Sequence, residues 1–253
     1  MWPVAIGMPC WRVVLGLIFV IVGPQAKAAD LQPVELELVL AVDVSSSVDA
    51  TEFRLQMHGL SQAFRHQDVV NAIAGSGQHG IAVTLVQWSG TNFHRTSVGW
   101  ALLRGPDGAA RFADAIDAAP RLMRGFTDIG GGILYSLAQI ETNRFDGRRK
   151  VIDVSGDGSS TQSNPGLERD RAVARGVTVN AVAILNEDPD LAEIGLAAYY
   201  RAFVTGGDGA FLMTAENFKD FAQVIKKKLL REITGPGVAA TQPSLWSTRV
   251  VAR

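Results

Sequence analysis

One carboxylate and two hydroxyls stand at alternate positions in the segment Asp43-Val44-Ser45-Ser46-Ser47. The segment directly follows an apolar run, residues 36–42, where an unpaired carboxylate costs several kcal/mol to bury. No Lys or Arg lies within ten residues of Asp43 in the sequence. Because hard cations bind oxygen ligands of this kind, the segment is a candidate metal-binding loop. The two serines have an alternative role as caps of the helix that follows.

Two further oxygen-rich segments occur later in the chain. Thr127 lies in Gly-Phe-Thr-Asp-Ile-Gly-Gly-Gly, just before a predicted helix, and Asp157 lies between two glycines after an apolar run that begins at Lys150. Capping that helix is an alternative role for Thr127, and for Asp128 it is a better interpretation than metal binding. If the apolar runs are parallel strands, their carboxyl ends share one edge of a sheet, where ligands bind. The three segments are therefore expected to converge.

Asp157 has two other interpretations. Asp157-Gly158 fits an ordinary turn. The segment 153–164 also imitates a calcium loop, because Asp153, Ser155, Asp157 and Gly158 occupy its first, third, fifth and sixth positions. That loop should end in a bidentate Glu and follow a helix, whereas this segment ends in Asn164 and follows a strand.

The elements that must position these residues alternate along the chain. Apolar or alternating runs predict strands, and apolar residues three and four apart predict helices. Strands are expected near 36–42, 81–88, 93–98, 150–155, 177–185 and 210–213, and helices at 50–73, 109–118, 133–140, 165–175 and 218–229. This order predicts a doubly wound, Rossmann-like α/β fold, with helices on both faces of a mostly parallel central sheet and one short antiparallel edge strand.

The N-terminal region is a predicted signal peptide over residues 1–28. Arg12 precedes ten apolar residues, 13–22, and Ala26-Lys27-Ala28 fits a small-x-small cleavage site. Ten residues are short for a spanning helix, which needs about 20, although an uncleaved anchor is the alternative. We therefore expect an exported protein, periplasmic or secreted, with no stable membrane span after cleavage. A domain over residues 35–233 and a flexible C-terminal tail over residues 234–253 complete the predicted organisation.

Composition excludes several classes of protein. The chain has 253 residues, of which 47% are hydrophobic, and its 24 basic residues nearly balance its 25 acidic ones, so it has no electrostatic footprint for nucleic acid. A single cysteine excludes a disulfide framework and a multi-cysteine metal site. The four histidines show no metal-ligand spacing, and neither a Gly-x-Ser-x-Gly elbow nor a phosphate-binding glycine loop is present in context. These observations favour a protein that is not an enzyme.

Taken together, the three segments resemble the von Willebrand factor A-type domains, also called integrin I-type domains, over nearly the whole predicted domain. That family has a metal-ion-dependent adhesion site made of Asp-x-Ser-x-Ser after the first strand, a Thr before a middle helix and an Asp-Gly after the central strand. The matching residues here are Asp43, Ser45, Ser47, Thr127 and Asp157. Ser155-Gly156 departs from the many relatives that have Thr directly before the acid. More narrowly, the chain resembles a bacterial exported branch of the superfamily.

The resemblance implies a function and a cofactor. Such sites hold Mg²⁺ or Mn²⁺, which then accepts a carboxylate from a partner protein. We therefore expect an exported adhesion or scaffold module that engages an acidic residue of its partner through the metal. The alternative is a periplasmic hydrolase or small-ligand-binding protein that uses the same cleft. Tyr199, Tyr200 and the acidic run 187–190 are predicted to form a surface loop flanking this face, where they are weak candidates for partner contact.

Overall fold

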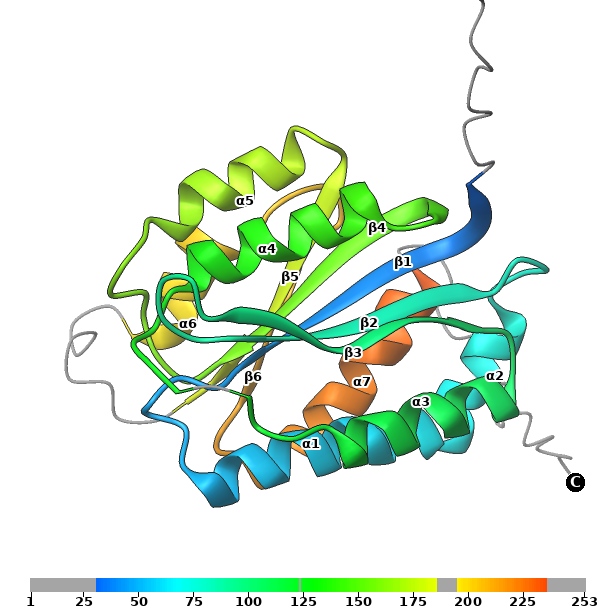
Figure 1. The fold of residues 1–253 in the computed structure, drawn as a ribbon, viewed down its shortest axis with the longest axis horizontal. Coiled ribbons are helices and arrows are strands. Elements are labelled where there is room, and N and C mark those ends of the chain that lie inside the picture. The colour runs from blue at the N-terminus through cyan, green and yellow to red at the C-terminus, as the bar shows by residue number, and fades with distance from the viewer. Residues whose placement is uncertain (1–30, 123, 186–194, 236–253) are drawn as a thin grey trace, which may run out of the picture. The chain divides into compact units, whose positions relative to one another are not determined.

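The computed structural model describes residues 31–122, 124–185 and 195–235. The predicted signal peptide and almost all of the predicted tail lie outside these ranges. The described residues form a six-stranded sheet in the order β3-β2-β1-β4-β5-β6 (Figure 1). The strands are β1 (Gln32–Asp43), β2 (Ile81–Trp88), β3 (His94–Leu103), β4 (Phe145–Gly156), β5 (Val177–Ile184) and β6 (Leu212–Ala215). Only the β2–β3 pair is antiparallel, which confirms the predicted α/β class.

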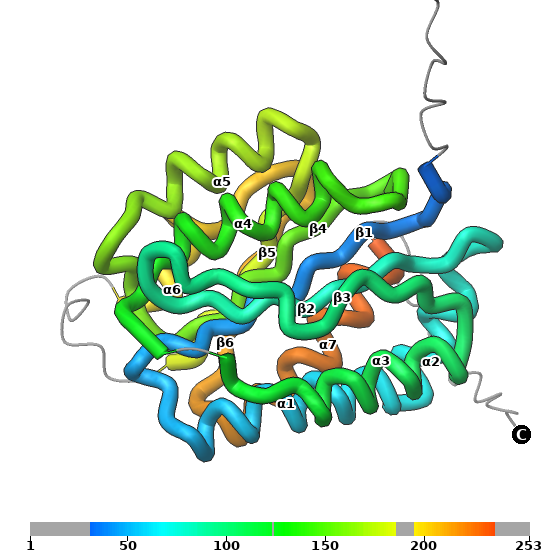
Figure 2. The backbone as a smooth tube through the Cα atoms, in the orientation of Figure 1, coloured from blue at the N-terminus to red at the C-terminus, as the bar shows by residue number. Residues whose placement is uncertain are grey.

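Helices cover both faces of the sheet. They are α1 (Ala50–Arg65), α2 (Gln67–Gly75), α3 (Pro106–Ala118), α4 (Ile129–Thr142), α5 (Pro165–Val173), α6 (Leu196–Tyr199), which continues as a π-helical turn over Tyr200–Val204, and α7 (Phe221–Thr234). Helices α4, α5 and α6 lie on one face, and α1, α2, α3 and α7 lie on the other (Figures 1 and 2). Within the described ranges, every helix is too short or too polar to cross a membrane.

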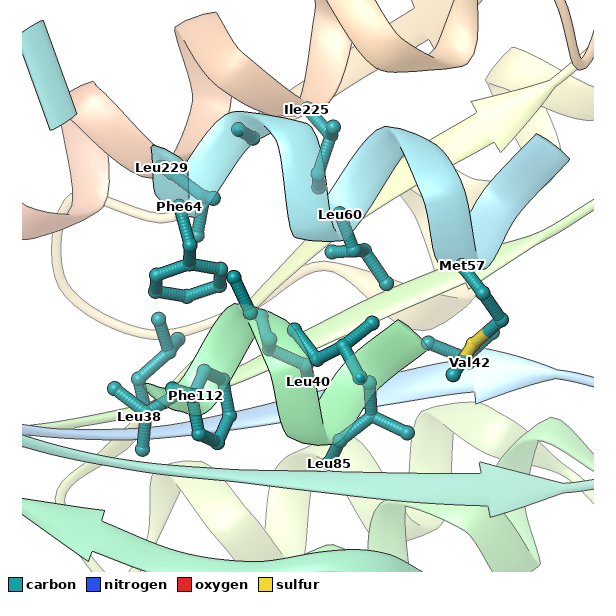
Figure 3. Packing of buried hydrophobic residues seen from close by; sticks show 14 of the residues in the cluster. Leu38, Leu40, Val42, Met57, Leu60, Phe64, Leu85, Phe112, Ile225 and Leu229 are labelled. Carbon is teal, nitrogen blue, oxygen red and sulfur yellow. The ribbon is translucent and has the colours of Figure 1, made fainter. Parts of the chain in front are cut away.

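Strand β1 is buried on both faces because its side chains alternate between two hydrophobic clusters. Leu36, Leu38, Leu40 and Val42 belong to the cluster beneath α1, α3 and α7, whereas Val39 belongs to the cluster beneath α4 and α5. Figure 3 shows residues of the first cluster, in which side chains of β1 lie against side chains of α1, α3 and α7. This continuous burial makes β1 the rigid centre of the domain.

The long predicted helix 50–73 is wrong in one respect, because it is two helices. Asp49 starts α1 with a capping box, in which its carboxylate accepts from the Glu52 backbone N–H at 2.8 Å and the Glu52 carboxylate accepts from the Asp49 N–H at 2.7 Å. His66 then adopts an extended conformation, with φ −69° and ψ 133°, and ends α1. Its imidazole Nδ1 caps α2 by accepting from the Asp68 N–H at 3.2 Å.

Other predicted elements differ from the structure at their ends. The antiparallel edge strand is ten residues long and runs to Leu103, beyond the predicted end at 98. The last strand begins at Leu212 instead of 210. Helix α5 starts at Pro165 with Asn164 as its cap, as the sequence indicates.

Candidate functional site

The order of the strands places the site at one edge of the sheet. Strand β1 pairs with β2 on one side and with β4 on the other, so the chain winds away from β1 in two directions. In open α/β sheets, ligands bind at such a switch point, outside the carboxyl ends of the strands. Asp43 is the last residue of β1, and Asp157 directly follows Gly156, the last residue of β4. Since Val42 pairs with Ser155, the two acids leave the sheet side by side.

The Asp43 carboxylate is completely buried. Its Oδ1 accepts a hydrogen bond of 2.7 Å from the Ser45 backbone N–H, while its Oδ2 has no hydrogen-bond partner in the described part of the chain. Burial, followed by the charge of Asp157, raises the pKa of Asp43 to about 8. A buried carboxylate with one unsatisfied oxygen and a second acid beside it is an arrangement that a cation would stabilise.

The two serines join Asp43 to Asp157. Ser45 Oγ lies 3.0 Å from Ser47 Oγ, and Ser47 Oγ donates a 2.8 Å hydrogen bond to Asp157 Oδ1. The alternative role of these serines as helix caps is wrong, because Asp49 caps α1. Four of the five predicted site residues are thus connected by hydrogen bonds, of which the one between Asp43 and Ser45 runs through the Ser45 backbone N–H.

Thr127 reaches the same edge through its neighbours. The Gly125 carbonyl accepts from the Ser46 N–H at 2.8 Å, which ties the loop before α4 to the loop after β1. The Thr127 carbonyl accepts from the Thr161 N–H at 2.8 Å, which ties it to the loop after β4. The half-buried Thr127 therefore lies where these three loops meet. Asp128 caps α4, as predicted, because its Oδ1 accepts from the Gly131 N–H at 3.0 Å.

The calcium-loop interpretation is wrong because Asp153 points away from this edge. Its carboxylate forms an ion pair with Lys228 of α7, in the core beneath the sheet. Lys228 also pairs with Glu232, at 2.5 Å, and all three side chains are at least 98% buried. The described residues contain no group of three or more His, Cys, Asp or Glu side chains that could hold a metal. A cation at the edge would therefore depend on hydroxyl oxygens as well as carboxylates.

Arg121 supports the loop after β1, and sequence analysis missed it. One nitrogen of its guanidinium donates to the carbonyls of Val44, Ser45 and Val48 at 2.7–2.8 Å. Arg121 lies 78 positions after Asp43 in the sequence, so no local pattern connects the two. The cation neutralises carbonyl dipoles of the loop and holds its backbone in place.

Gly156 leaves room for the Asp43 carboxylate because it has no side chain. A Cβ atom at this position would lie 2.5 Å from Tyr200 Oη, 3.0 Å from Asp43 Oδ2 and 3.2 Å from the Trp88 ring. Tyr200 is fully buried, and its hydroxyl donates to the Gly158 carbonyl at 3.3 Å. Its predicted place in a surface loop is therefore wrong. The acidic run 187–190 of that predicted loop lies outside the described residues.

An exposed aromatic side chain adjoins the site. Phe126, next to Thr127, is 70% exposed. The backbone on either side of it is fixed, because the Gly125 and Thr127 carbonyls accept the hydrogen bonds described above. Phe93, at the tip of the β2–β3 hairpin, is 40% exposed, and its ring approaches Gly125. Phe126 and Phe93 together place exposed apolar surface beside the loop before α4.

Several solved structures share this fold. The domain aligns with proximal thread matrix protein 1 from the mussel byssus (TM-score 0.54, 18% identity) over 82% of this chain and 49% of that one. It aligns with the pilus adhesin SpaC of Lactobacillus rhamnosus GG (0.58, 15%) over 81% and 31%. It also aligns with a von Willebrand factor type A protein of Catenulispora acidiphila (0.52, 14%) over 79% and 43%. The chain thus spans about half the length of the mussel protein and a smaller share of each of the other two proteins.

Sequence comparison gives the family. No curated protein matches the chain. The model of a family described as "Protein of unknown function (DUF1194)" matches residues 33–237, most of the chain. The chain therefore belongs to the DUF1194 family, and its fold is that of the von Willebrand factor A-type domains.

Proposed function

We propose that the chain is an exported protein-binding module that engages its partner through a divalent cation at the edge of the sheet. Asp43, Ser45, Ser47, Thr127 and Asp157 would hold the ion, which is Mg²⁺ or Mn²⁺. The observation that carries this proposal is the buried Asp43 carboxylate, whose Oδ2 lacks a hydrogen-bond partner in the described part of the chain.

The set of donor atoms fits a hard cation. All the side-chain donors are oxygens, which Mg²⁺ and Mn²⁺ prefer over nitrogen and sulfur. Three of the five are neutral hydroxyls, so a bound ion would keep affinity for a further negative ligand. A carboxylate of a partner protein would supply that ligand. One solved structure of the mussel protein, which has a similar fold, is described as having a zinc-occupied MIDAS motif, that is, a metal-ion-dependent adhesion site. This description supports a divalent ion here.

Two observations support a protein partner over a substrate. The similar structures include a matrix protein and a pilus adhesin, which favours a non-enzymatic role. Phe126 and Phe93 add apolar surface beside the proposed ion. The second candidate, a periplasmic hydrolase or small-ligand-binding protein, predicts metal-dependent turnover of simple esters or phosphates. The predicted signal peptide supports an exported protein, periplasmic or secreted.

Affinity capture tests this function. The immobilised domain is incubated with envelope extract in Mg²⁺ or in EDTA, beside a Ser47→Ala variant and a Ser97→Ala control on β3. We expect a captured protein that is present in Mg²⁺, absent in EDTA, retained by the control and lost with Ser47→Ala. A captured set that is identical in all four lanes would contradict the proposal.

A further inference from the structure

A cavity of about 670 Å³ lies between the β2–β3 hairpin, α4 and α5. Small-molecule sites occupy roughly 300–1,000 Å³. Leu134, Leu137 and Ala138 of α4 supply an apolar wall. None of the five proposed metal ligands lines this cavity. It is therefore a separate candidate site.

Two buried polar side chains face the cavity. His94 is 8% exposed and Asp128 is 4% exposed, and both belong to its lining. His94 Nε2 lies 3.7 Å from Asp128 Oδ2, beyond hydrogen-bond distance, and has no hydrogen-bond partner among the described residues. A buried polar atom without a partner costs about 1–3 kcal/mol. A polar group that lies between the two side chains would remove that cost.

Gly131 keeps the space between them open. A Cβ at this position would lie 2.6 Å from His94 Nε2 and even closer to Asp128 Oδ2. A real Cβ atom does not approach non-bonded atoms this closely, so any side chain here would displace the pair. The absence of a side chain at Gly131 therefore lets the imidazole and the carboxylate face the same space.

In the described part of the chain, no Lys or Arg forms an ion pair with Asp128, and His94 is the one basic side chain paired with it. At the rim, Arg171 pairs with Glu168 at 3.0 Å and Arg175 pairs with Glu141 at 2.7 Å, so these charges cancel. Burial lowers the pKa of His94, so its ring is neutral at pH 7 and offers a lone pair instead of a charge. With the ring proton on Nδ1, Nε2 and Asp128 Oδ2 are two adjacent acceptors.

We propose that this cavity binds a small organic molecule with a primary ammonium group and an apolar body. The ammonium group carries three N–H donors, enough to reach both Asp128 Oδ2 and His94 Nε2. Its positive charge complements the buried carboxylate, and the apolar body lies against Leu134 and Leu137. The site is independent of the proposed metal.

Calorimetric titration with 2-phenylethylamine tests this site, with 2-phenylethanol as the matched neutral probe. We expect the amine to bind at least tenfold more tightly than the alcohol at pH 7. Asp128→Asn should abolish this preference while retaining the cap of α4, since Asn caps helices as well as Asp. Asp49→Asn, a matched change at the cap of α1, should retain the preference for the amine over the alcohol.

A second variant guards against an indirect effect of the Asp128 substitution. Gly131→Ala should lower affinity for the amine at least tenfold, and circular dichroism should show a folded protein. Equal binding of amine and alcohol, no binding of either, or an unchanged preference in folded Asp128→Asn would each overturn the proposal. Because Mg²⁺ titration reports on the other site, failure here leaves the metal proposal intact.

Discussion

Ser47 Oγ donates a 2.8 Å hydrogen bond to Asp157 Oδ1, across 110 positions of the chain. This bond joins the loop after β1 to the loop after β4, which are neighbouring parallel strands. The candidate site therefore depends on the pairing of β1 with β4, because neither loop alone contains all of its residues. Changes that loosen either loop should affect metal binding before they unfold the domain.

Arg121→Lys should weaken binding of a divalent cation by roughly tenfold. Lysine keeps the charge but lacks the planar guanidinium that bonds the carbonyls of Val44, Ser45 and Val48. We expect the free energy of unfolding to fall by about 1–3 kcal/mol, the scale of a charged hydrogen bond. Urea unfolding and Mg²⁺ titration measure the two effects. Arg111→Lys, at an exposed position on α3, is the control, and equal behaviour of the two variants would refute the role of Arg121.

Gly156→Ala should destabilise the domain by about 1–3 kcal/mol, as overpacked positions do. The added methyl group would press on Tyr200 Oη, Asp43 Oδ2 and the Trp88 ring. Gly99→Ala is the matched control, because a Cβ at that strand position meets nothing within 4 Å. Thermal unfolding of both variants measures the difference. A Gly156→Ala protein as stable as Gly99→Ala would show that this packing is loose.

Phe126→Ala should reduce partner capture while leaving the affinity for Mg²⁺ unchanged. If Phe126 is one of the few residues that dominate the interface, its truncation should cost about 2 kcal/mol, which is about a thirtyfold change in affinity. Leu167→Ala removes another exposed apolar side chain, on α5, and serves as the control. If Phe126→Ala captures the partner as well as Leu167→Ala does, the apolar surface beside the ion has no part in recognition.

The buried acid Asp153 makes stability depend on pH. Burial, and then the charge of Glu232, raise the pKa of Asp153 to about 7, from an ordinary value of 3.8. Between these values the folded protein binds more protons than the unfolded chain, so this residue's contribution to stability falls as pH rises from about 4 through about 7. Asp153→Asn removes that titration. Urea unfolding at pH 5 and pH 8 should show a smaller loss of stability in the variant, and an equal loss in both proteins would contradict the assignment.

The fold could be predicted because local patterns and tertiary burial agree. The apolar run of β1 is buried on both faces, and the spacing of Phe53, Met57, Leu60 and Phe64 does form the buried face of α1. The break at His66 has a signal in the sequence that the single-helix prediction overlooked. Gln67 and Asp68 occupy the positions three and four after Phe64, and the next buried apolar residues are Val69 and Ile73. The two helices separate only because an extended residue allows both to pack on the same core.

That the candidate ligands lie close together could be predicted from their positions at strand ends and from the family resemblance. Their role as metal ligands stays a prediction. The supporting residues could not be found in this way. Arg121 bonds three backbone carbonyls, and a sequence carries no signal for such a contact. Tyr200 lies in a mostly apolar stretch, with Leu196 and Val204 four residues before and after it, and its ring is buried while its hydroxyl bonds a carbonyl of the loop after β4. These contacts depend on how distant elements pack.

Titration of the domain with Mg²⁺, by isothermal calorimetry, tests the central claim most directly. The comparison is with an Asp43→Ala and Ser47→Ala double variant that circular dichroism shows to be folded. Our account predicts that one ion binds per wild-type chain and that affinity falls at least tenfold in the variant. Folded wild-type protein that takes up neither Mg²⁺ nor Mn²⁺, or a double variant that binds as tightly as wild type, would contradict it.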